Sequence, residues 1–205
     1  MSGHPFLSSL RQFGTLATTT GKIENVDNIT AVLEQRNRVC RIDISGIPCL
    51  YLEKVLATMQ EPFPELTELT LWSHLETMVV LPDSFLGGSA PRLRILDLFN
   101  IPFPGLPKLL LSATHLVNLR LSNIPYSGYF SPEAIATALS TLTSLAVLQI
   151  EFQSPLSLPD RASRRPPSPK RFVFPFLTYF TFKGLANTWT TSWSVSMPLY
   201  SKGWV

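Results

Sequence analysis

Three histidines and two cysteines are the residues of this chain best suited to metal binding or nucleophilic catalysis. His4, His74 and His115 are scattered, and none has a carboxylate or thiol partner at a catalytic or metal-ligand spacing. Cys40 and Cys49 lie nine residues apart, which fits neither a paired zinc motif nor a disulfide framework. The sequence also lacks a G-x-x-x-x-G-K-S/T phosphate loop, a G-x-S-x-G elbow and an H-E-x-x-H motif. We therefore expect no enzyme, no metal site, no cofactor and two reduced thiols.

The overall composition indicates a folded protein rather than a charged, disordered one. Hydrophobic residues make up 45% of the 205 residues and charged residues 15%, which is enough apolar material for a core. The net charge of +3 is too small to indicate a nucleic-acid partner by itself. Residues 1–21 lack a basic segment followed by a continuous apolar run. We expect an intracellular protein, cytoplasmic or nuclear, with no membrane association.

An apolar pattern of the form L-x-x-L-x-L, with other apolar residues allowed, occurs six times. Successive copies start 27, 27, 23, 29 and 32 residues apart, which is the period of a leucine-rich repeat. Gly-Ile-Pro or Asn-Ile-Pro follows three of the copies at one fixed offset. The six copies span Val39 to Ile44, Leu66 to Leu71, Leu93 to Leu98, Leu116 to Leu121, Leu145 to Ile150 and Leu177 to Phe182.

Each copy predicts a short strand that pairs in parallel with the next, ended by proline and followed by a returning helix. The expected helices cover an opening segment from Asp27 or Asn28 to about Arg36, then Leu50 to Met59, Leu106 to Ser112, and a segment beginning at Ser131-Pro132-Glu133. The predicted fold class is α/β: an irregular leucine-rich-repeat solenoid of about six repeats, with a parallel sheet on the concave face and helices on the convex face. The usual asparagine position of the repeat holds His74, Ile101, Ile124 and Gln153, so no regular asparagine ladder is expected.

The domain limits follow from where the pattern begins and fails. Residues 1–21 are expected to be a flexible N-terminal segment, and 22–184 to be the repeat domain with a Pro/Arg-rich insertion at 153–171. Residues 185–205 are expected to be an irregular, poorly packed tail, and one hypothesis is that a frameshift or splicing event produced them. The insertion forms a basic loop, interpreted either as a solvated loop or as a phosphate-binding or nuclear-localisation patch. Its basic residues are Arg161, Arg164, Arg165, Lys170 and Arg171.

The concave face is the expected binding surface, because alternate strand residues point outward and stack into columns across the repeats. Trp72 and Phe99 are neighbours in one column, with Asp97, Arg120 and Asp43 in the adjacent one. Two adjacent exposed aromatic residues are typical of a protein-binding hot spot. The alternative, that both rings pack against loops and seal the edge of the solenoid, stays open at this point.

Several segments together resemble the leucine-rich region of basidiomycete fungal F-box proteins over roughly residues 22–184. They include connecting segments and the Pro-rich insertion as well as leucines. The segments are NITAVLEQRNRVCRIDI, LEKVLATMQEPFPELTELTLW, PDSFLGGSAPRLRILDL, NIPFPGLPKLLLSATHLVNLRLSNIPYSGYFSPEAIATALSTLTSL and SPLSLPDRASRRPPSPKR. In such proteins an N-terminal F-box binds a Skp-type adaptor of a cullin ubiquitin ligase, and the repeats receive the substrate.

The resemblance implies a non-catalytic protein-protein interaction module with an unknown protein partner on the concave face. Residues 1–38 contain no L-P-x-E/D opening of an F-box, so a Skp-type adaptor is expected only if an F-box exists upstream. One alternative is a truncated or frame-shifted fragment without independent function. A weaker alternative is a nucleic-acid-associated protein that uses the basic segment 161–171.

Overall fold

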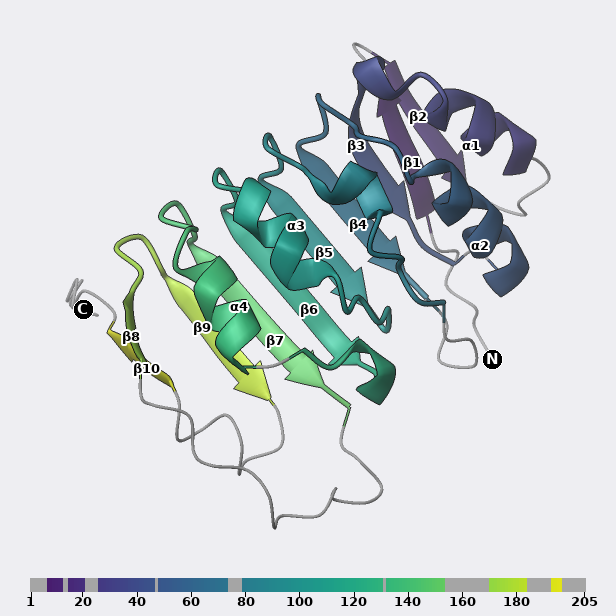
Figure 1. Ribbon diagram of the computed structural model, residues 1–205. Coiled ribbons are helices and arrows are strands. Elements are labelled where there is room, and N and C mark those ends of the chain that lie inside the picture. Colours follow the sequence, from purple (N-terminus) through teal and green to yellow (C-terminus); the bar gives the residue numbers. More distant parts are fainter. Residues whose placement is uncertain are drawn as a thin grey trace, which may run out of the picture.

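A computed structural model of the chain describes residues 7–12, 15–20, 26–46, 48–73, 79–130, 132–153, 170–183 and 193–196. It shows an α/β fold built on an eight-stranded sheet with the strand order β2-β1-β3-β4-β5-β6-β7-β9 (Figure 1). The six strands from β3 to β9 in this order all run parallel, so the predicted α/β class with a parallel sheet is confirmed. These strands are β3 (Val39–Ile44), β4 (Glu68–Trp72), β5 (Ile95–Phe99), β6 (Asn118–Ile124), β7 (Val147–Phe152) and β9 (Tyr179–Lys183).

The parallel strands pair in the register that the apolar pattern predicts. Ile42 lies opposite Leu69, Leu69 opposite Leu96, and the series continues through equivalent residues to β9. The apolar residues of β3 to β7 alternate with less buried ones, as expected for a sheet with one covered face. Burying a leucine at such a position stabilises the fold by roughly 1.5–3 kcal/mol.

A continuous ladder of backbone hydrogen bonds joins the repeats just before each strand. In each case a backbone N–H donates to the carbonyl one repeat earlier, at the same distance of 2.8 Å. Because the same bond recurs at every step, the repeats stack without a break from β3 to β9. The donors are Thr67, Arg94, Val117, Ala146 and Thr178, and their acceptors are Cys40, Thr67, Arg94, Val117 and Ala146.

Short helices return the chain and cover one face of the sheet (Figure 1). They are α2 (Cys49–Thr58), α3 (Leu106–Ser112) and α4 (Pro132–Leu139). Helix α1 (Val26–Leu33) packs beside α2 and ends before the predicted Arg36, which instead begins a 3₁₀ turn, η1 (Arg36–Arg38). Between β4 and β5 the described helical segment is η2 (Phe85–Gly88), which is kinked because Leu86 and Gly87 have left-handed φ angles of +54° and +63°.

The residue that opens each Gly-Ile-Pro or Asn-Ile-Pro motif turns the chain out of its strand. Gly46, Asn100 and Asn123 all have left-handed φ angles, +70°, +55° and +56°. Glycine and asparagine adopt this conformation more readily than other residues, which explains the motif.

Side-chain amides link the ends of three strands, which the sequence did not predict. Asn123 Nδ2 donates to Asn100 Oδ1 at 3.3 Å, and Gln153 Nε2 donates to the same oxygen at 2.9 Å. Asn100 is buried, so these bonds satisfy an oxygen that water cannot reach freely. A short amide ladder therefore exists, one position earlier in two repeats than the usual asparagine position.

Two chain segments differ from the sequence-based expectation. Where 1–21 was expected to be flexible, β1 (Leu7–Gln12) and β2 (Thr15–Thr20) form an antiparallel hairpin, and β1 pairs with β3. The hairpin covers the backbone edge of β3, which would otherwise be open to pairing with another chain. The Ser/Thr-rich composition of these strands gave no apolar alternation to detect.

A second, two-stranded parallel sheet joins β8 (Lys170–Val173) and β10 (Trp193–Ser196). Lys170 and Arg171 therefore begin a strand rather than belonging wholly to a loop. Part of the tail at 185–205 is likewise a strand, because its backbone finds a partner in β8. The origin of this tail by frameshift remains a hypothesis.

The amide ladder yields a stability prediction at Asn100. Asn100→Ala removes the acceptor of both side-chain hydrogen bonds. It also places alanine at a φ of +55°, where a residue other than glycine, asparagine or aspartate is strained. We therefore expect the unfolding free energy to fall by about 2–4 kcal/mol. Asn100→Gly removes the same bonds but accepts the φ angle, and should lose less. Urea unfolding of both variants measures the difference. Equal losses would contradict a role for the left-handed backbone.

Candidate protein-binding face

The strand side chains that point away from the helices form what we call the open face. It comprises the alternate, outward residues of β3, β4, β5, β6, β7 and β9. None of these lies in the buried core, whereas their neighbours along each of the first five strands do. The face is therefore set by the same alternation that builds the core.

A polar row runs across the open face in the register predicted from the sequence. Asp43 lies opposite Thr70, Thr70 opposite Asp97, and Asp97 opposite Arg120. The row continues through Gln149 and Thr181. Three of the five residues selected from the sequence, Asp43 on β3, Asp97 on β5 and Arg120 on β6, thus lie in one row.

The other two selected residues form an aromatic stack in the next row. Trp72 and Phe99 are paired across β4 and β5, with ring centroids 5.0 Å apart and ring planes 28° apart. Trp72 remains 39% exposed, and Phe99 is half-buried. An offset stack of this kind is favourable beyond the area it buries. It holds two large rings at the carboxyl ends of adjacent strands.

The open face also carries two ion pairs that the sequence analysis did not predict. The equivalent positions of the paired residues in neighbouring repeats are the one signal in the sequence that could have predicted them. Arg41 Nη1 lies 3.1 Å from Glu68 Oε2, and Lys183 Nζ lies 3.0 Å from Glu151 Oε1. Both pairs join residues directly opposite each other on adjacent strands. The side chains are partly solvent-exposed, so each pair contributes little stability, about 0–1 kcal/mol. Their main effect is to neutralise charge at both ends of the face.

Asp97 has an unusual electrostatic environment for a surface carboxylate. Burial raises the pKa of its carboxyl above the ordinary value of 3.8, Arg120 lowers this pKa and Asp43 raises it. Within the ranges that the structure describes, no hydrogen bond or ion pair reaches the Asp97 side chain. The ionised form is therefore incompletely stabilised in the folded protein.

Asn118 is a second polar residue of this face, and its side-chain oxygen lacks a hydrogen-bond donor among the described residues. It lies between Ile95 and Val147 in the row next to Asp97. Its Oδ1 atom is buried and has no hydrogen-bond partner among the described residues. A buried amide oxygen without a donor destabilises the fold.

The remaining residues singled out from the sequence are histidines, cysteines and the basic residues of the insertion. Arg161, Arg164 and Arg165, as well as His4 and His74, lie outside the described residues. His115 is exposed in the turn before β6, and Cys40 is a half-buried thiol on β3. Among the described residues, no group of three or more His, Cys, Asp or Glu side chains is placed to hold a metal ion. No described helix is long and apolar enough to cross a membrane.

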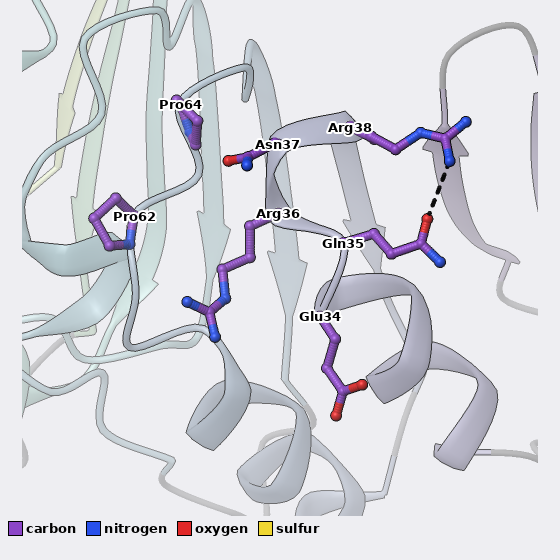
Figure 2. Close-up of a pocket in the computed structure, with 7 residues that line it drawn as sticks. All are labelled: Glu34, Gln35, Arg36, Asn37, Arg38, Pro62 and Pro64. Carbon is purple, nitrogen blue, oxygen red and sulfur yellow. Dashed lines mark hydrogen bonds between the residues drawn. The ribbon is translucent and has the colours of Figure 1, made fainter.

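A pocket of about 710 Å³ lies at the opposite, amino-terminal end of the strands (Figure 2). Arg36 Nη1 forms an ion pair with Glu61 at 3.4 Å, but Arg36 Nε is buried without a hydrogen-bond partner among the described residues. Arg38 donates to Gln35 at 3.5 Å. The pocket contains none of the residues selected from the sequence, and its charges are of both signs. Its lining residues are Glu34, Gln35, Arg36, Asn37, Arg38, Pro62 and Pro64.

Comparisons with known proteins leave the open face as the main guide to function. No family model matches the chain, and no curated protein or solved structure is significantly similar to it.

Asp97 yields a prediction on pH dependence. Since burial raises its pKa in the folded state, ionised Asp97 disfavours folding at neutral pH, and this effect is absent below the ordinary value of 3.8, where both states are protonated. Asp97→Asn should therefore raise the unfolding free energy at pH 7, and its advantage should shrink as the pH falls toward 3. Denaturant unfolding across this range measures the difference. An advantage of Asp97→Asn that grows as the pH falls would contradict the prediction.

Asn118 yields a second stability prediction. Asn118→Val removes the unpartnered oxygen and places a β-branched side chain between Ile95 and Val147, so unfolding free energy should rise by about 1 kcal/mol. Gln149→Val is the control on the same face, because its Nε2 donates to Ser122 Oγ at 3.1 Å and that bond would be lost. A thermal melt in which Asn118→Val is the less stable of the two would refute the prediction.

Proposed function

We propose that this chain is a non-catalytic protein-interaction module whose open face binds a protein partner. We further propose that it is a leucine-rich-repeat solenoid, resembling the substrate-binding repeats of a fungal F-box receptor of a cullin ubiquitin ligase. Support for the repeat class comes from the regular apolar pattern and the helices on the other face of the sheet. The strand register also pairs equivalent residues of adjacent repeats, with one shift between β6 and β7 after Leu121. A stack of repeats offers an extended surface of this kind to a partner.

The observation that carries the proposal is the Trp72–Phe99 stack, which lies next to the polar row of the open face. Tryptophan is among the residues that contribute most to protein-protein binding, and such residues are typically surrounded by a polar rim. Trp72 is exposed, and Asp97 lies on the same face beside the rings. The remaining exposure of Trp72 favours the hot-spot interpretation over the alternative that the rings only seal the sheet.

The ligase part of the resemblance is a narrower proposal. Binding to a Skp-type adaptor requires an F-box, and residues 1–38 carry no L-P-x-E/D opening. In the described structure, β1, β2 and α1 occupy part of this region. The activity that we propose for residues 1–205 is therefore partner binding through the open face, and adaptor binding is not part of this proposal.

Trp72→Ala tests the proposed function. It removes most of the exposed aromatic surface and should reduce partner binding at least tenfold, because central tryptophans commonly contribute 2 kcal/mol or more. Affinity purification from a basidiomycete lysate with quantitative mass spectrometry measures the bound proteins, and a thermal melt measures folding.

Leu111→Ala is the matched control, because Leu111 is 49% exposed but lies on α3, which covers the other face. It should leave the bound proteins unchanged. If Trp72→Ala lowers the melting temperature strongly and leaves binding intact, the rings seal the sheet and the proposal fails.

A further inference from the structure

Strand β9 is the last strand of the eight-stranded sheet, and its outer side is one of the two ends of the stack. The strand order stops at β9, and β8 and β10 pair with each other in a separate sheet. No described strand pairs with the outer side of β9, whereas the hairpin of β1 and β2 covers the edge of β3 at the other end. A strand edge of this kind is a template for pairing with another strand.

The backbone of β9 directs two phenylalanine residues toward this edge. The N–H of Tyr179 donates to the carbonyl of Ala146 at 3.1 Å, so the backbone groups of Tyr179 point toward β7. Successive residues of a strand direct their N–H and C=O groups to opposite sides. Phe180 and Phe182 therefore direct theirs outward, away from β7.

The side chains of the same two residues leave the core incompletely covered at this end. Leu148 and Ile150 on β7 are fully buried, but Phe180 and Phe182, which lie opposite them, are only half-buried. Tyr179, at the start of β9, is 49% exposed. A further strand beyond β9 would cover this apolar surface, as β9 covers that of β7.

The sequence of β9, YFTFK, complements itself when two copies pair antiparallel with Thr181 at the centre. Phe180 then lies opposite Phe182 of the second copy, and each such pair exchanges both of its backbone hydrogen bonds. The phenyl rings also meet on the covered side of the sheet, which is favourable between strands. Lys183, the one charged residue of β9, faces Tyr179 of the second copy, so no like charges lie opposite each other.

We propose that this chain forms a two-fold symmetric dimer by antiparallel pairing of its β9 strands. The second copy is the occupant of the edge because β9 matches its own backbone pattern, ring positions and charge. The symmetry axis passes through the sheet at Thr181, so the two sheets join into one with both open faces on the same side. This inference does not rest on the proposed function. It adds that each dimer presents two Trp72–Phe99 stacks on one continuous face.

The first test changes the charge at the symmetry axis. Sedimentation velocity of the full chain at rising concentration should show a monomer–dimer equilibrium. Thr181 is half-buried on the open face, so Thr181→Glu and Thr181→Lys each place two like charges opposite each other without altering the core. Each variant should raise the dimer dissociation constant about fivefold or more, and their equimolar mixture should restore dimerisation. Thr70→Lys, in the same row but on β4, is the matched control and should dimerise normally.

The second test uses a disulfide and does not depend on weakening the dimer. The two Thr181 residues would form a non-hydrogen-bonded pair with Cα atoms roughly 4.5 Å apart, which a disulfide can span. In a chain carrying Cys40→Ser and Cys49→Ser, Thr181→Cys should give a linked dimer on mild oxidation, seen by non-reducing electrophoresis. Thr70→Cys in the same background should remain monomeric in this assay.

Three outcomes would overturn the proposal. The first is a monomer at every concentration, which would show that another part of the chain covers the edge. The second is a dimer that both charged variants at Thr181 leave unchanged. The third is equal cross-linking of Thr181→Cys and Thr70→Cys, which would indicate random collision.

Discussion

Each strand of the parallel sheet depends on its neighbours for its backbone hydrogen bonds and for burial of its apolar side chains. Leu96 on β5 lies between Leu69 and Leu119, and all three are fully buried. A single repeat has one helix or turn and one strand, which is too little to enclose these residues. The stack is therefore stable as a whole, and the hairpin of β1 and β2 closes its first edge by pairing with β3.

The same register determines what the open face presents to a partner. Because Leu69 lies opposite Leu96, Thr70 must lie opposite Asp97, and Trp72 must lie opposite Phe99. A shift of one residue would bury the aromatic rings and expose the leucines. The aromatic stack and the incompletely stabilised carboxylate of Asp97 are thus fixed by packing on the other side of the sheet. Rigid presentation of this kind lowers the entropy cost of binding.

Much of this arrangement could be predicted from the sequence, since it follows from a periodic pattern. The strand Val39–Ile44 and the helix Leu106–Ser112 have the predicted bounds, and the polar row from Asp43 to Thr181 has the predicted register. Features that depend on contacts between dissimilar residues could not be predicted. The bond from Gln153 to Asn100 joins residues 53 positions apart with no shared motif, and the Ser/Thr-rich hairpin is stabilised by pairing with β3 rather than by its own apolar pattern.

The most direct measurement of the central claim is where a bound protein partner touches this chain. The partner captured by the full chain would be cross-linked to it chemically, and mass spectrometry would locate the links. The account predicts links to open-face residues around the aromatic stack, such as Thr70 and Ser122, which flank it in the register. Links concentrated on α2, α3 and α4, or in the pocket at Arg36, would show that binding uses another surface and would contradict the account.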